Sequence, residues 1–188
     1  MRVLILFGTN EGHTHKIARF LSDRLSGQGH EVTMADARDL PVDLSPACHD
    51  LVIVAARVHA GASPRAVLGF VRRRREALQR MPTAFISVSM AAARHRPGDA
   101  EREAQYVDQF IAKTGWMPGH IYHAAGARLY TKHNALTRWI LGLVDRHRDD
   151  TSCDHEFTDW EKLAAFADEV ADAANQLAQE GGGDGECA

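Results

Sequence analysis

Short apolar runs alternate along the chain with segments of helical periodicity, and this alternation restricts the possible folds more than any other feature. Residues 3–7 and 51–55 are apolar at every position, which is typical of central parallel strands covered on both faces. Further strands are expected at 31–35, 83–88 and 120–125. Because helical segments separate these strands, the pattern predicts a doubly wound α/β domain with a five-stranded parallel sheet.

Capping signals mark where the helices between these strands are expected to begin. Thr14 or a close neighbour is expected to cap the first helix, and Ser63-Pro64 reads as an N-cap followed by proline at the first helical position. A third helix is expected over 100–114. The last helix is expected to open with the capping box Thr158-Asp-Trp-Glu161.

Residues 128–157 exceed what a minimal five-strand domain requires. They contain an apolar stripe at helical spacing, which predicts an amphipathic helical insertion after the fifth strand. The stripe comprises Leu136, Trp139, Ile140, Leu143 and Val144. The domain is expected to span residues 1–178, and the glycine-rich, acidic residues 179–188 are expected to be a disordered tail.

Charge divides the chain into two unequal parts. The formal net charge is -3, yet residues 149–188 contain 12 acidic residues and one basic residue. Residues 1–148 contain 21 basic and 13 acidic residues, so the first part is about +8 and the second about -11. Positive charge in the first part suits carboxylate or phosphate ligands.

Composition and cysteine usage exclude several classes of protein. The 45% hydrophobic and 25% charged content is that of a globular domain, not of a disordered or collagen-like chain. No apolar run approaches the roughly 20 residues that span a bilayer. Cys48, Cys153 and Cys187 are widely spaced and are expected to be free thiols. We therefore expect a cytoplasmic protein.

The loop between the first strand and the first helix carries the most chemical information. Residues 9–14 read Thr-Asn-Glu-Gly-His-Thr, and such a loop directs backbone N–H groups and hydroxyls to one point at a helix N-terminus, which suits a monophosphate. The loop is neither G-x-G-x-x-G nor a P-loop, so it indicates neither a dinucleotide nor a nucleoside triphosphate. The alternative is a plain strand-to-helix turn.

This loop resembles the FMN-phosphate loop of flavodoxin-like proteins, which carry the pattern Thr9-x-x-Gly12-x-Thr14 after the first strand. With Glu11 at its third position, it is most similar to the bacterial menaquinone-dependent protoporphyrinogen IX dehydrogenases. The resemblance extends to about residue 175 and implies the strand order 2-1-3-4-5. Further segments occur in matching order: 57–61, 81–89, 125–130 and 158–160.

The resemblance implies three groups of cofactor-binding residues. The FMN phosphate would lie against Thr9, Asn10, Glu11, Gly12, His13 and Thr14, with Glu11 turned away. The N5 edge of the isoalloxazine ring would lie against Val58, His59, Ala60 and Gly61, and the other side of the ring against Ser89, Met90, Ala91 and Ala92.

The loops expected beside the ring contain no aromatic residue except His59 and His95. Electron-carrier flavodoxins typically stack a Trp and a Tyr on the ring, whereas an open ring face suits a flavoprotein that oxidises a bound substrate. Weaker FMN binding is the alternative explanation of this absence.

Four arginines follow carboxyl ends of strands, where they would attract the propionate carboxylates of a porphyrin and favour the reduced flavin. They are Arg57, Arg94, Arg96 and Arg128; the alternative is that they are solvated surface residues. The run Arg72–Arg75 reads as a solvated helix face, with a membrane surface or acidic partner as the alternative. Because no stacking aromatic residues accompany this run, it does not indicate nucleic-acid binding. The pair His120-x-x-His123 lacks the further ligands of a metal site.

The function implied by the resemblance is FMN-dependent oxidation of protoporphyrinogen IX to protoporphyrin IX, with menaquinone or ubiquinone as acceptor, in heme biosynthesis. No side chain stands out as a catalytic base. The stripe Leu136, Trp139, Ile140 and Leu143 would either cover the core or contact a quinone or the inner face of the cell membrane. A flavodoxin-like electron carrier and an NAD(P)H:quinone reductase are the alternative functions.

Overall fold

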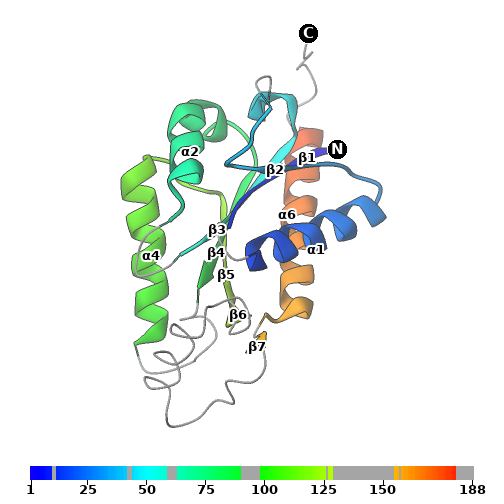
Figure 1. Cartoon of the computed structure of the whole chain (residues 1–188). Helices are drawn as coiled ribbons and strands as arrows, with labels where there is room; N and C mark the ends of the chain where they lie inside the picture. The colour runs from blue at the N-terminus through cyan, green and yellow to red at the C-terminus, as the bar shows by residue number, and fades with distance from the viewer. Residues whose placement is uncertain are drawn as a thin grey trace.

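The structure, a computed structural model of the chain, describes residues 1–9, 12–41, 44–58, 63–89, 98–125, 127–128, 155–156 and 158–180. Five parallel strands form one sheet in the order β2-β1-β3-β4-β5 (Figure 1). The strands are β1 (Arg2–Gly8), β2 (Glu31–Asp36), β3 (Leu51–Arg57), β4 (Thr83–Ser89) and β5 (His120–Ala125). The predicted strands and the strand order implied by the resemblance are confirmed.

Helices cover both faces of this sheet, as the doubly wound pattern predicts (Figure 1). The helices are α1 (His13–Gly27), α2 (Arg65–Leu78), α4 (Asp99–Thr114) and α6 (Trp160–Glu180), with a 3-10 turn, η1 (Pro46–Cys48). α1 and α6 pack on the face that includes Val3 and Ile5 of β1, and α2 and α4 pack on the face that includes Leu4 and Leu6. β1 and β3 are therefore apolar throughout because both faces are buried.

The helix starts differ from those predicted. α1 has Gly12 as its N-cap residue, so Thr14 lies inside the first turn and does not cap it. The N-cap residue of α2 is Pro64 and not Ser63, since the extended ψ of 130° at Pro64 delays the helix to Arg65. The predicted capping box at Thr158 is also wrong, because Asp159 takes that role.

Asp159 accepts a hydrogen bond from the Lys162 N–H at Oδ1, 3.0 Å away, and its carbonyl accepts one from the Leu163 N–H. The Thr158 hydroxyl is directed away from α6 and bonds to the end of β5. Thr158 and Asp159 both favour the N-cap position. The hydrogen bond of Thr158 to β5 leaves the capping role to Asp159.

The segment predicted as an insertion is bounded by a short antiparallel pair. β6 (Ala127–Arg128) pairs with β7 (His155–Glu156), with Ala127 opposite Glu156 (Figure 1). The predicted helix of the insertion lies outside the described residues, as do residues 181–188 of the predicted tail. Residues 179 and 180, expected in that tail, are instead the last residues of α6. Within the described part, no helix is both long and apolar enough to cross a membrane.

Gly8 lets α2 approach the end of β1 closely. A Cβ atom at this position would lie 2.4 Å from Val67 Cγ2 and 3.3 Å from the Pro64 ring. We expect Gly8→Ala to lower the free energy of unfolding by about 1–3 kcal/mol because the helix must shift. Gly27→Ala is the matched control, since its Cβ would meet nothing within 4 Å. Urea denaturation of the cofactor-free protein compares them, and equal stabilities would contradict the expected clash.

Candidate functional site

The end of β1 and the start of α1 form a tight turn built around Gly12. The Gly12 N–H donates to Thr9 Oγ1 at 2.9 Å, and Gly12 has φ 89°, in the left-handed region that favours glycine. Thr9 is buried at the end of β1, and Thr14 is fully buried in the first turn of α1. The two threonines and the glycine predicted from the sequence therefore meet at one place.

This turn fits a phosphate group. Thr14 Oγ1 is buried and has no hydrogen-bond partner within the described part of the chain, although buried hydroxyls in proteins are normally bonded. The first turn of α1 contains no acidic residue, and its N-cap residue Gly12 supplies no side-chain cap, so neither places negative charge at the positive end of the helix dipole. A buried donor at a helix N-terminus suits an anion.

The two segments predicted to contact the flavin ring leave neighbouring strands at the same level. β3 pairs with β4 so that Arg57 lies opposite Val88, and the Val58 N–H donates to the Val88 carbonyl at 2.8 Å. Val58 and Ser89 are both buried where these strands end. They lie at the carboxyl edge of the sheet, where open α/β sheets bind ligands.

Of the other predicted site residues, the structure describes Arg57 fully and Arg128 only by its backbone. Arg57 is half-buried at the end of β3, and the backbone of Arg128 lies in β6. The structure does not describe Asn10, Glu11, His59, Ala60, Gly61, Met90, Ala91, Ala92, Arg94 and Arg96, nor the stripe residues Leu136, Trp139, Ile140 and Leu143.

A contact that the sequence reasoning missed joins His13 to Thr158. His13 Nε2 lies 2.8 Å from Thr158 Oγ1 and 3.3 Å from the carbonyl oxygen of Ala125, the last residue of β5. Thr158 Oγ1 donates to the same carbonyl at 2.9 Å. The Thr-Asp-Trp segment offered a signal for a structural role, but its reading as a helix cap concealed this one.

His120 and His123 cannot act together on one ion. They are three residues apart in β5, so their side chains leave opposite faces of the sheet. His123 faces α4, where its Nδ1 lies 3.9 Å from a carboxylate oxygen of Glu103.

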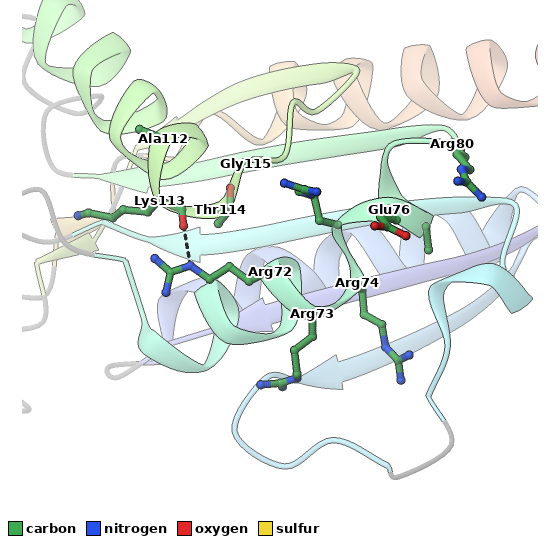
Figure 2. A pocket seen from close by; sticks show the side chains of 11 residues that line it. Arg72, Arg73, Arg74, Glu76, Arg80, Ala112, Lys113, Thr114 and Gly115 are labelled. Carbon is green, nitrogen blue, oxygen red and sulfur yellow. Dashed lines mark hydrogen bonds between the residues drawn. The ribbon is translucent and has the colours of Figure 1, made fainter.

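The run Arg72–Arg75 lines a surface hollow of about 720 Å³ between α2 and α4. Arg72 Nε donates to the Lys113 carbonyl at 2.5 Å, while Arg73 and Arg74 extend away from α4 (Figure 2). The C-terminal parts of both helices lead into the amino ends of β4 and β5, so the hollow lies away from the edge that carries the phosphate turn. These arginines are therefore not part of the candidate site.

An ion pair between α1 and α6 holds the helix that follows the phosphate turn. Arg24 Nε donates to Asp168 Oδ1 at 2.7 Å, and Gln28 Nε2 donates to the same oxygen. The hydrogen bond from Arg24 is the main reason that the pKa of Asp168 lies below its ordinary value. The pair tethers the second half of α1 to α6.

We expect Asp168→Asn to lower the melting temperature at neutral pH by no more than a few degrees, because the pair is partly exposed. A depressed carboxyl pKa stabilises the fold above the unfolded-state pKa and is lost as the pH falls through the folded-state value. The difference between wild type and variant should therefore shrink below about pH 4. Melting curves across pH measure it, with the exposed Asp172→Asn as control; a difference that grows on acidification would contradict the assignment.

Comparison with known proteins agrees with the fold and with the turn between β1 and α1. Residues 4–154 match the family model described as a flavodoxin domain, so the chain belongs to the flavodoxin-domain family. Over 174 residues it is 29% identical to the protoporphyrinogen IX dehydrogenase (quinone) of Escherichia coli strain K12, covering 91% of this chain and 95% of the relative. A protein of the same name from Leishmania major is 25% identical over 177 residues, covering 90% of this chain and 74% of the relative.

Solved flavodoxin structures share the fold. A short-chain flavodoxin associated with a bacterial microcompartment has a TM-score of 0.56 at 15% identity, covering 93% of this chain and 99% of its own. The flavodoxin of Streptococcus pneumoniae TIGR4 has a TM-score of 0.56 at 16% identity, covering 92% and 99%. Family membership makes this chain an FMN protein of the flavodoxin type, and its relatives place it among the oxidoreductases. The turn that fits a phosphate agrees with FMN as the cofactor.

Proposed function

We propose that the protein oxidises protoporphyrinogen IX to protoporphyrin IX and transfers the electrons to a quinone, menaquinone or ubiquinone, in heme biosynthesis. The observation that carries the proposal is the phosphate turn, whose Thr14 hydroxyl has no partner among the residues that the structure describes. The chain aligns over nine-tenths of its length with proteins named for this reaction.

In this proposal, the residues at the carboxyl edge of the sheet hold FMN, which supplies a two-electron acceptor when bound. Residues 9–14 hold its phosphate through backbone N–H groups and the Thr14 hydroxyl. Residues 58–61 contact the edge of the ring that carries N5, and residues 89–92 line its other side. Val58 and Ser89 fix where these two segments begin.

Arginines at this edge would bind the substrate. Arg57 is half-buried at the end of β3, and the other candidates are Arg94, Arg96 and Arg128. Charge-assisted hydrogen bonds from these arginines to the propionates would orient the macrocycle. The reaction balances when each porphyrinogen loses three hydrogen pairs and three quinones each gain one pair. The protein must therefore release a quinol and bind a fresh oxidised quinone after each pair, while the macrocycle stays bound or rebinds.

The apolar stripe of the insertion is our candidate for contact with the quinone or the membrane surface. Replacing Trp139 and Ile140 by glutamine should abolish turnover with a long-chain quinone in vesicles and spare turnover with a water-soluble quinone. Loss of both activities together with a lower melting temperature would instead assign the stripe to the core.

One anaerobic experiment tests the proposed reaction against its alternatives. Purified protein loaded with FMN is mixed with protoporphyrinogen IX or with NADPH, and flavin bleaching is followed before quinone is added. Bleaching by the porphyrinogen and recovery with quinone support the proposal. Bleaching by NADPH alone supports an NAD(P)H:quinone reductase, and reduction only through a reductase protein supports an electron carrier.

A further inference from the structure

The side chains of His13 and Thr158 form a bridge between three segments that are far apart in the chain. His13 is the first residue of α1, Ala125 is the last residue of β5, and Thr158 precedes α6 by two residues. His13 is nearly buried, with 9% of its surface exposed. The hydroxyl of Thr158 lies at the centre of this His13–Thr158 bridge, within 2.9 Å of both other partners.

The protons of the bridge can be assigned from its geometry. Thr158 has one hydroxyl proton, which it donates to the Ala125 carbonyl. Its oxygen must then accept from His13, so His13 Nε2 carries a proton directed at the hydroxyl. Removing the Thr158 hydroxyl would deprive this nearly buried N–H of its partner at 2.8 Å, and the Ala125 carbonyl lies farther away, at 3.3 Å.

The bridge acts on a residue inside the phosphate turn. His13 lies between Gly12, whose backbone is left-handed, and Thr14, whose buried hydroxyl is unpartnered among the described residues. Gly12, the N-cap residue of α1, supplies no side-chain cap. A ring fixed by two oxygens of distant segments therefore restrains the backbone at the point where the N–H groups of the first turn must converge.

We propose that Thr158 is a positioning residue of the FMN-phosphate site, acting through His13 to hold the start of α1 in its binding geometry. The inference rests on the proposed phosphate site at residues 9–14. It assigns to Thr158 a role outside α6, although the residue lies more than 140 positions from the turn that it positions.

Comparing FMN with riboflavin tests this role, because riboflavin has the same ring and no phosphate. We expect Thr158→Val to weaken FMN binding about tenfold, the usual effect of losing one hydrogen bond that orders a site, and to leave riboflavin affinity unchanged. Thr158→Ser keeps the hydroxyl and should retain wild-type affinity for both ligands. Fluorescence titration of the full-length, cofactor-free proteins measures both constants.

Several outcomes would overturn the inference. Equal weakening of FMN and riboflavin binding would mean a general structural role, and unchanged FMN affinity would mean no role at this site. Wild-type protein that binds no FMN would overturn the proposed function and this inference with it, whereas a neutral Thr158→Val in an FMN-binding protein overturns the inference alone.

A second pair of variants keeps the test decisive if Thr158→Val folds poorly, which melting without flavin would reveal. His13→Phe removes the N–H donor and should also weaken FMN more than riboflavin, while His13→Gln keeps a side-chain N–H and should restore part of the affinity. Thr158→Val should have no further effect in the His13→Phe background, since both act through one bridge. Additive losses would contradict the coupling.

Discussion

Replacing Thr14 by valine should stabilise the cofactor-free protein and weaken FMN binding in the same variant. The Thr14 hydroxyl is fully buried without a partner among the described residues, so a methyl group of similar size removes an unsatisfied polar atom. We expect a gain of about 1 kcal/mol in the free energy of unfolding. The hydrogen bond to the phosphate is lost, and a bond to a charged group contributes about 1.5–3 kcal/mol, or roughly 10- to 100-fold in affinity.

General damage to the fold would lower both the stability and the FMN affinity, whereas this prediction has the stability rise and the affinity fall. Urea denaturation without flavin and fluorescence titration with FMN provide the two measurements, and Thr14→Ser, which keeps the hydroxyl, is the matched control for binding. A valine variant that binds FMN as tightly as wild type would show that the hydroxyl does not face the phosphate.

Phe85→Ala should lower the free energy of unfolding by about 3–5 kcal/mol. Phe85 lies in the interior strand β4, is fully buried, and stacks on Phe110 with ring centroids 4.2 Å apart. Trp116 packs edge-on against both rings. Truncation therefore removes one member of an aromatic cluster whose other members are held by α4 and by the segment before β5.

Urea denaturation of the cofactor-free protein measures this effect. Phe85→Leu, which retains most of the volume, should cost much less, and Met117→Ala, which alters an exposed side chain, should change little. A loss below about 1 kcal/mol for Phe85→Ala would mean that the cluster rearranges to fill the space.

The buried strands β1 and β3 were predictable because each contains an uninterrupted run of apolar residues in the sequence. β1 and β3 are covered on both faces by helices, so every position is apolar and no period competes with the signal. The edge strand β5 is less regular, with Ile121 exposed, and its prediction depended on its place in the alternating order.

Helix starts were less predictable because several residues near each start favour the same role. Thr158 and Asp159 can both cap a helix, and only the position of the Ala125 carbonyl decides that Asp159 does so. Thr14 was expected both as a cap and as a phosphate donor, and the structure leaves its hydroxyl unused by the helix. The local sequence shows which residues can cap a helix, but a contact with a distant segment determines which of them does.

β6 and β7 pair through two residues each, so the ends of the segment between Arg128 and His155 are held together whatever its length. Opposed residues in an antiparallel pair lie about 5 Å apart, a gap that a two-residue turn can also close. The entropic cost of closing a loop rises only with the logarithm of its length. The intervening 26 residues can therefore change in length at little entropic cost to the paired strands that enclose them.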